Sequence, residues 1–217
     1  MGNVGQGLTL AALLTGLMTG CAAEEAEPDG ASGASAKTSA KVAQRGGSIG
    51  ASGSACELPV TFDIAEFWKA KAVDAEEATG ATGDLADLAD AFLRQGPVTM
   101  ACEVDAKPAG KIGFLRVWTG EPGDSDARAV LEAFVAAEQG ASGARYSTLK
   151  AGDITGTEVE YVTTSELLEE TKQEHALAVT TPEGPVVLHL GGMDTAEHRA
   201  MLPAYELAKS TLHTTAD

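Results

Sequence analysis

The stretch HALAVTTPEGPVVLHLG, residues 175–191, holds two apolar runs of strand length on either side of a short polar segment. That segment is Thr181-Pro182-Glu183-Gly184, with proline at its second position and glycine at its fourth. Both positions suit a type I β-turn, and two strand-like runs joined by a turn indicate a hairpin. We therefore predict antiparallel strands over 175–180 and 185–191.

Further strands are predicted before the hairpin. They cover 145–150 and 155–164, where apolar and polar residues alternate. Nearer the N-terminus, two more alternating runs predict strands with one buried face each: Cys56, Leu58, Val60, Phe62 and Ile64 in the first, and Val98, Met100, Cys102 and Val104 in the second. Residues 112–119 are apolar on both parities, which is typical of a central strand covered on both sides.

Two helices are predicted between these strands. Residues 84–94 have apolar side chains at helical spacing, and Gly96-Pro97 ends the run. A second helix begins with Asp124 or Ser125 as its cap and runs to Gln139. Its predicted buried stripe is Ala127, Val130, Leu131, Phe134 and Val135.

A closing helix follows the hairpin. Asp194 and Glu197 form a capping-box pattern at its start, and Pro203 is expected to kink it or to start a second helix. Its apolar face is Met201, Tyr205, Ala208 and Leu212. The acidic segment 165–172 predicts a helical turn. The order of elements predicts the α+β class, a twisted, mostly antiparallel sheet covered by helices.

The region before the domain has the pattern of a lipoprotein leader. Residues 8–20 form an apolar run that is too short to cross a membrane but has the length of a signal-peptide core. Met18-Thr19-Gly20-Cys21 resembles a bacterial lipobox, although no Lys or Arg precedes Cys21. We predict a signal peptide over 1–20 and a lipidated Cys21 that anchors the chain to the extracytoplasmic face of the cell membrane.

Residues 22–55 are rich in Ala, Gly and Ser and contain no aromatic residue. Such a segment buries too little apolar surface to offset its ordering entropy, so we predict a disordered tether over 21–55 and a globular domain over 56–217. Gly46-Gly47-Ser48-Ile49-Gly50 matches the G-x-S-x-G nucleophile elbow, a motif that needs a strand before it and a helix after it. Because neither is expected here, we interpret the match as chance.

Lipidation of Cys21 would leave Cys56 and Cys102 as a pair. Disulfides persist outside the cytoplasm, so we predict a disulfide between them, with two free buried thiols as the alternative. It would join the first strand of the domain to the strand that follows the first helix.

The charge of the chain limits its partners. The formal net charge is −17, and all but one unit of it lies from Cys56 onward. A strongly acidic body repels nucleic acid and anionic headgroups. We therefore expect no nucleic-acid partner, and we expect membrane association to come from the anchor at Cys21.

Two parts of the domain resemble Mog1/PsbP-like domains. One is Val60-Thr61-Phe62-Asp63-Ile64 followed by Trp68, and the other is the hairpin 176–190 leading into the closing helix with Ser210. Lipoproteins of the LpqN type, from high-GC Gram-positive bacteria, are similar. The resemblance covers about 56–213 and implies a binding or assembly module, as Mog1 is for the GTPase Ran and PsbP is at photosystem II.

Motifs for catalysis or cofactors are absent from the sequence: there is no H-E-x-x-H, no G-x-x-x-x-G-K-[ST] and no C-x-x-C. His175 and His189 flank one turn and could be cross-strand neighbours, but we interpret them as ordinary strand histidines rather than metal ligands. We predict no catalytic, cofactor-binding or metal residue. The expected function is a tethered binding or assembly module with an unknown protein or small-molecule partner, and the alternative is an envelope hydrolase.

Overall fold

The hairpin predicted over 175–191 lies inside a long antiparallel sheet. The computed structural model describes residues 41–74, 92–152 and 154–215. Within them, β9 (Glu170–Thr181) and β10 (Gly184–Gly192) pair with Leu177 opposite Leu188, so the prediction of the hairpin is confirmed. The hydrogen-bonded order around this pair is β3-β5-β6-β10-β9-β8-β7, and β4 pairs with β5 beside that path. The other strands of this sheet are β3 (Lys69–Ala72), β4 (Arg94–Gln95), β5 (Val98–Asp105), β6 (Gly113–Thr119), β7 (Ala141–Ala151) and β8 (Ile154–Ser165).

A smaller sheet has the order β1-β2-β11. Its strands are β1 (Arg45–Ile49), β2 (Val60–Ala65) and β11 (His213–Thr214). The first strand of the predicted domain therefore begins at Val60 rather than at Cys56. Pro59 precedes it, and its ring nitrogen has no hydrogen to donate to a ladder.

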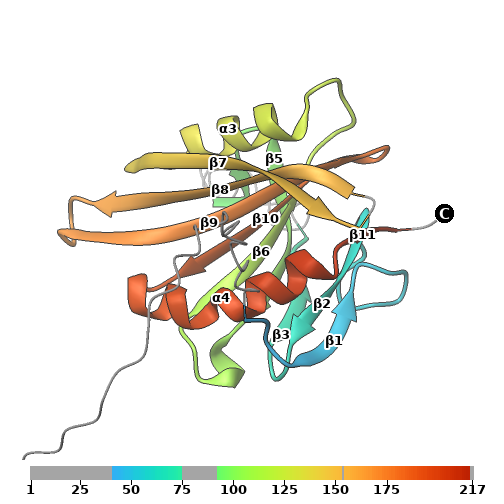
Figure 1. Cartoon of the computed structure of the whole chain (residues 1–217), viewed down its shortest axis with the longest axis horizontal. Helices are drawn as coiled ribbons and strands as arrows, with labels where there is room; N and C mark the ends of the chain where they lie inside the picture. The colour runs from blue at the N-terminus through green and yellow to red at the C-terminus, as the bar shows by residue number, and fades with distance from the viewer. Residues whose placement is uncertain (1–40, 75–91, 153, 216–217) are drawn as a thin grey trace, which may run out of the picture. The chain divides into compact units, whose positions relative to one another are not determined.

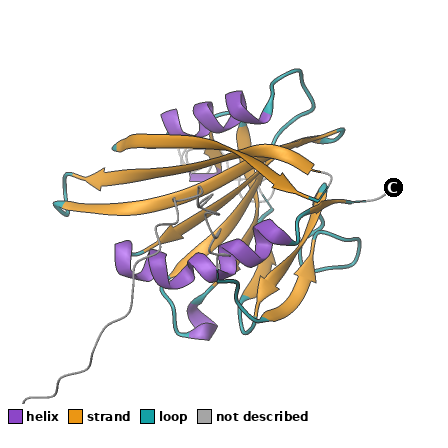
Figure 2. Cartoon of the chain, viewed as in Figure 1, coloured by secondary structure: helices purple, strands orange, loops and turns teal. Residues whose placement is uncertain are grey.

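The helices lie on opposite faces of the large sheet (Figure 1). Helix α3 (Ala127–Ala136) packs on β7 to β10, and α4 (Thr195–Ser210) packs on β6, β9 and β10 and also on β2. A short 3-10 helix, η1 (Lys107–Ala109), connects β5 to β6. Strands predominate, and the helices cover less of the sheet than the α+β prediction implies (Figure 2).

The two faces of the sheet carry two separate apolar cores. Leu177, Val179 and Leu188 pack on the α4 side, whereas Ala178 and Val187 pack on the α3 side. This is the period of two expected of strands. The predicted stripes are confirmed, because all five apolar residues named for α3 and all four named for the closing helix are buried. Strand β6 lies between β5 and β10, as predicted for a central strand.

The helices differ from the predictions at both ends of α3, in the partner of Glu197 and at Pro203. Helix α3 ends at Ala136 rather than at Gln139. Asp126 caps α3, one or two residues later than expected, and accepts a hydrogen bond from the backbone N–H of Ala129 at 2.8 Å. Asp194 caps α4 as predicted, but the Glu197 carboxylate accepts from the N–H of Ile112 at 3.0 Å. Helix α4 continues through Pro203 without a second start.

The segment 165–172 is not helical as predicted, and only the last three residues of the helix predicted over 84–94 are described. Residues 166–169 form a turn between β8 and β9, and Glu170 pairs with Ser165, because ladder hydrogen bonds satisfy this backbone better than one helical turn. Of the helix predicted over 84–94, residues 84–91 lie outside the described residues, and Arg94 belongs to β4.

The predicted tether is wrong for its last part. Residues 45–49 form β1, with Ser48 opposite Asp63 and Ile49 opposite Phe62. Arg45 forms an ion pair with Asp63 at 2.7 Å, and the Ser48 hydroxyl donates to the same carboxylate. The glycine-rich composition did not indicate a strand. Glycine is needed at this point of the strand, since Gly46 packs directly against the backbone of Ala65, where a side chain would not fit. The folded domain therefore begins before Cys56.

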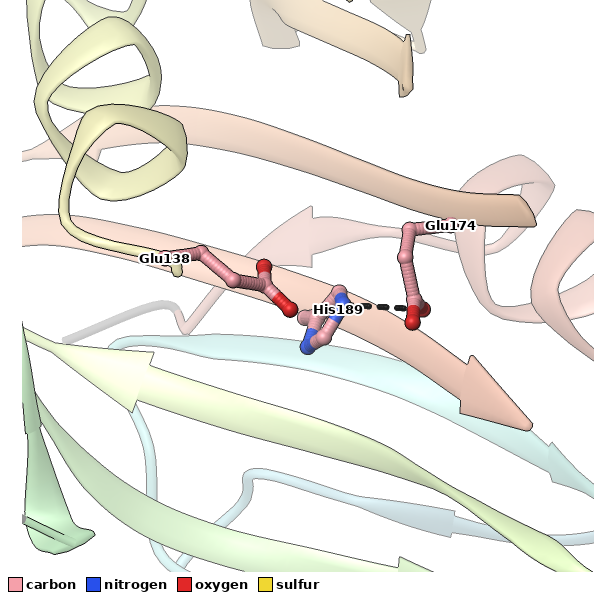
Figure 3. A group of neighbouring side chains, drawn as sticks. All are labelled: Glu138, Glu174 and His189. Atoms are coloured by element: carbon pink, nitrogen blue, oxygen red, sulfur yellow. Dashed lines mark ion pairs between the residues drawn. The ribbon is translucent and has the colours of Figure 1, made fainter. Parts of the chain in front are cut away.

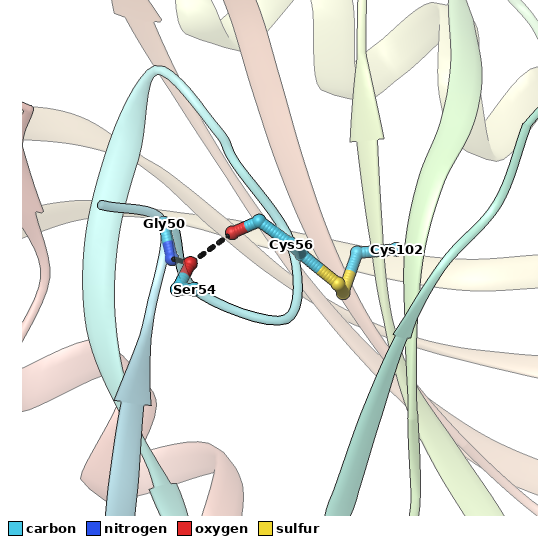
Figure 4. Close-up of a disulfide and its surroundings, with 4 residues drawn as sticks. All are labelled: Gly50, Ser54, Cys56 and Cys102. Atoms are coloured by element: carbon cyan, nitrogen blue, oxygen red, sulfur yellow. Dashed lines mark hydrogen bonds between the residues drawn. A yellow bond between two sulfur atoms is a disulfide. The ribbon is translucent and has the colours of Figure 1, made fainter. Parts of the chain in front are cut away.

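The predicted disulfide is confirmed. Cys56 and Cys102 are bonded, with Cα atoms 6.0 Å apart. The bond is predicted to start from the first strand of the domain, but Cys56 lies in the loop between β1 and β2. Cys102 lies in a strand, as predicted, and that strand is β5 of the other sheet. Figure 4 shows how this loop is held: the Ser54 hydroxyl donates to the carbonyl of Cys56 at 2.6 Å and accepts from the N–H of Gly50 at 3.1 Å.

Candidate functional site

A groove opens on the α3 side of the large sheet, where α3 does not cover β5 and β6. Its volume is about 950 Å³. The face of β6 that forms its floor carries Phe114, Arg116 and Trp118, and Met100 and Glu103 of β5 lie opposite Trp118 and Arg116 in the register. Phe134 of α3 packs edge-on against Trp118, with ring centroids 5.5 Å apart, and so supports the floor of the groove from the α3 core.

The rim of the groove is apolar and exposed. Phe92, Ile112 and Met193 line it with 71%, 54% and 57% of their surfaces accessible. Exposed large apolar side chains that gather around one concavity are typical of a binding surface. We call these three residues the apolar rim.

The floor is polar and balanced in charge. Arg116 forms an ion pair with Glu103 at 2.9 Å, and its guanidinium carbon lies 4.8 Å from the centre of the Phe114 ring. The buried indole nitrogen of Trp118 has no hydrogen-bond partner among the described residues. The accessible cation of the floor is therefore the Arg116 guanidinium, which is paired with Glu103, in a chain of net charge −17.

A largely buried polar cluster adjoins the groove, and two of its members, His189 of β10 and Glu138 just after α3, line the groove. Figure 3 shows these two residues with Glu174 of β9, and Tyr161 of β8 completes the cluster. The register of β8, β9 and β10 explains why Tyr161, Glu174 and His189 meet. Glu174 lies opposite Tyr161, and Ala176 lies opposite His189, so all of these side chains point to the α3 side of the sheet.

The atoms of this cluster are close together. Nε2 of His189 lies 3.1 Å from the Tyr161 hydroxyl and 3.3 Å from Oε2 of Glu174. The Tyr161 hydroxyl donates to Oε2 of Glu138 at 2.5 Å. Lys172 holds the other oxygen of Glu174, Oε1, at 2.8 Å. Although Glu174 is 0% exposed, its Oε2 accepts no aligned hydrogen bond from a described residue.

The pKa values in the cluster are shifted in opposite directions. Burial by itself raises the pKa of Glu174, but the nearby His189 and Lys172 outweigh it and leave the pKa below its ordinary value. Burial and the negative charge of Glu138 raise the pKa of Tyr161. At neutral pH the cluster therefore holds an ionised Glu174 and a protonated tyrosine.

The two histidines considered from the sequence are not neighbours. His189 points to the α3 side, whereas His175 points to the α4 side and stacks on His198, with Nδ1 of His175 2.7 Å from Nε2 of His198. The prediction that they are ordinary strand histidines missed the partners of His189, because Glu138, Tyr161 and Glu174 come from three other segments. Of the predicted site residues, Cys56 and Cys102 are brought together, and Cys21 lies outside the described residues.

Comparisons with known proteins found a matching family model and a similar solved structure. The model of a family described as uncharacterised lipoprotein matches residues 26–212. No curated protein matches the chain. Among solved structures, it is similar to the solution structure of cyanobacterial PsbP (CyanoP) from Synechocystis sp. PCC 6803, with a TM-score of 0.46 and 12% sequence identity. That similarity covers 72% of this chain and 87% of the other.

Proposed function

The chain belongs to the family of uncharacterised lipoproteins, and from this membership we propose that it is a membrane-anchored binding module of the cell envelope. In this proposal Cys21 carries the lipid, and the folded domain stands on the extracytoplasmic face. No helix among the described residues has the length and apolar character needed to cross a membrane. Two acyl chains on one cysteine would give stable anchoring.

The groove is the observation that supports a binding function most strongly. A volume of about 950 Å³ falls in the range of small-molecule sites, which are mostly apolar and carry a few polar groups. The apolar rim suits a hydrocarbon part of a ligand. Arg116, which lines the groove and is partly exposed, suits an acceptor or anionic group on the same ligand. We propose that the ligand is a small amphipathic molecule with an acidic or acceptor head.

Hydrolysis, the alternative function, finds less support in the groove. A hydrolase of the serine or cysteine type needs a nucleophile beside its histidine. The described polar partners of His189 Nε2 are Tyr161 and Glu174, and the raised pKa of Tyr161 makes that hydroxyl a poorer nucleophile. We therefore propose binding rather than bond cleavage.

The anchor is tested by replacing Cys21 with Ser and separating membranes from soluble material. The anchored protein is expected in the membrane fraction, and the Cys21→Ser variant in the soluble fraction. If both variants partition with membranes equally, the proposed anchor is wrong.

The groove is tested with 1-anilinonaphthalene-8-sulfonate, an amphipathic anion whose fluorescence rises in apolar sites. We expect the folded protein to bind it, and we expect Phe92→Ser and Arg116→Gln to weaken binding. Phe67→Ser is the matched control, because Phe67 is also exposed but does not line the groove. Equal binding by all variants, or none by the native protein, would contradict the proposal; near-UV circular dichroism verifies that each variant is folded.

A further inference from the structure

We propose that His189, Glu174 and Glu138 form a binding site for a divalent transition-metal cation beside the groove, with the Tyr161 hydroxyl as a fourth donor. The ligand atoms of the first three residues all lie within 4.8 Å of one another. This site is independent of the amphipathic ligand proposed above, because it uses the buried cluster beside the groove and not the apolar rim.

Two of the distances between donor atoms fit one small cation. Zinc binds imidazole nitrogen and carboxylate oxygen at roughly 2.0–2.2 Å, so neighbouring ligand atoms of a tetrahedral site lie about 3.3 Å apart. The separation of His189 Nε2 from Glu174 Oε2 is 3.3 Å, and that from the Tyr161 hydroxyl is 3.1 Å. Glu138 is the least buried member and can adjust, since it follows the end of α3 and lines the groove.

An unsatisfied carboxylate oxygen points to the missing ion. Oε2 of Glu174 is buried and receives no aligned hydrogen bond from a described residue, although His189 Nε2 lies 3.3 Å away, and a charged oxygen without such a bond is costly. This oxygen lies on the His189 side of the carboxylate, and Oε1 is the one that Lys172 holds (Figure 3). A cation between His189 and Glu174 would give Oε2 the partner it lacks.

The donor set indicates the class of metal. Calcium takes six to eight oxygen ligands, and magnesium keeps an octahedral shell with several waters. A buried site with one imidazole nitrogen and two carboxylates suits zinc or a neighbouring first-row cation better. Outer hydrogen bonds already orient the ligands: Lys172 contacts Glu174 at 2.8 Å, and the Gln95 amide contacts Glu138 at 3.4 Å.

Lys172 provides a test that a structural role for the cluster would not predict. Its ammonium neutralises Glu174 in the absence of a metal, and it would repel a cation bound at the opposite oxygen. We therefore expect Lys172→Met to bind the metal more tightly than the native chain. If the cluster were only a structural network, the same substitution would weaken it without any gain in metal affinity.

The experiment titrates Zn²⁺ into metal-free, unlipidated Cys21→Ser protein by isothermal calorimetry, with Co²⁺ as a spectroscopic probe in the visible range. We expect about one ion per chain, at least about tenfold weaker binding in Glu174→Gln and Glu138→Gln, and tighter binding in Lys172→Met. Glu138→Gln keeps an acceptor for Tyr161 and lies near the surface, so it tests the site even if Glu174→Gln fails to fold.

Two control variants locate the ion. Glu103→Gln removes a groove carboxylate outside the cluster, and His175→Gln removes a histidine on the opposite face; both should bind Zn²⁺ as the native chain does. Absence of Zn²⁺ binding, binding unchanged by Glu138→Gln, or binding lost in His175→Gln would each overturn the proposal.

Discussion

Cys56 lies in the loop between β1 and β2 of the small sheet and Cys102 lies in the large sheet, and the bond between them fixes one sheet to the other with Cα atoms 6.0 Å apart. Both cysteines are buried in the same apolar core as Phe62 and Leu188. The link therefore acts where β2 and its loop meet the α4 side of the large sheet. It also ties the two ends of the segment that contains β2, β3 and β4.

Replacing both cysteines with Ala should destabilise the domain strongly. The bond spans a sequence separation of 46, and the chain-entropy model assigns about 4 kcal/mol to a loop of that size. Urea unfolding of Cys56→Ala/Cys102→Ala should therefore show a much lower midpoint than the native chain. The native protein should lose a similar amount when reductant is added, whereas the double variant should not respond to reductant. A midpoint that is the same in both proteins would contradict the prediction.

Removal of β1 should also cost stability, although its composition predicts a tether. A chain that begins at Ser54 loses the ion pair of Arg45 with Asp63, the pairing with β2 and the buried side chain of Ile49. Burial of one Ile side chain alone contributes about 1.5–3 kcal/mol. We expect the shortened chain to unfold at a clearly lower urea concentration than a chain that begins at Lys41, and equal midpoints would show that β1 contributes nothing.

Helix α3 should depend on a single aromatic anchor. Phe134 is fully buried and makes edge-on contacts with Trp118 and with the ring of His189. Phe134→Ala should lower the free energy of unfolding by about 3–5 kcal/mol, the usual range for a buried aromatic residue. Glu132→Ala, on the exposed face of the same helix, should change it by less than about 0.5 kcal/mol. Chemical denaturation of both variants checks the difference.

The periodic spacing of apolar residues along the sequence made much of the fold predictable. The stripe from Ala127 to Val135 is buried in α3, and the runs around Leu177 and Leu188 form the central hairpin. The prediction fails where another contact replaces apolar burial as the reason for a strand. Residues 45–49 form one because Arg45 and Ser48 bond to Asp63 and because glycine permits close backbone packing, and neither effect appears in an apolar pattern.

The disulfide could be predicted, and the polar cluster could not. With Cys21 predicted to carry lipid and the domain predicted to lie outside the cytoplasm, Cys56 and Cys102 are the one pair left. This prediction does not depend on where the strands lie. Glu138, Tyr161, Glu174 and His189 come from four segments, and only the register of β8, β9 and β10 brings the last three together. His189 has no neighbour in sequence that indicates a site, so its partners became visible only with the fold.

Stability should fall as the solution is acidified, because His198 is buried in its neutral form. Burial, with the positive charge of a protonated His175 as a smaller cause, lowers the pKa of His198 to about 4, from 6.5 in an unfolded chain. In the unfolded chain His198 therefore binds a proton as the pH falls below about 6.5, whereas in the folded chain it does not bind one until the pH falls to about 4. The stability that depends on this group is complete above pH 6.5 and is lost as the pH falls towards 4.

The size of the loss follows from the difference between the folded and unfolded pKa of His198, and one substitution isolates it. A tenfold change in proton affinity corresponds to about 1.4 kcal/mol, so the loss for His198 is on the order of 3 kcal/mol. His198→Gln should remove that part of the pH dependence and keep a polar partner for His175, whose Nδ1 lies 2.7 Å from His198 Nε2. Urea midpoints measured from pH 7 to pH 4 test this, and a His198→Gln curve parallel to the native one would show that acid acts through other groups.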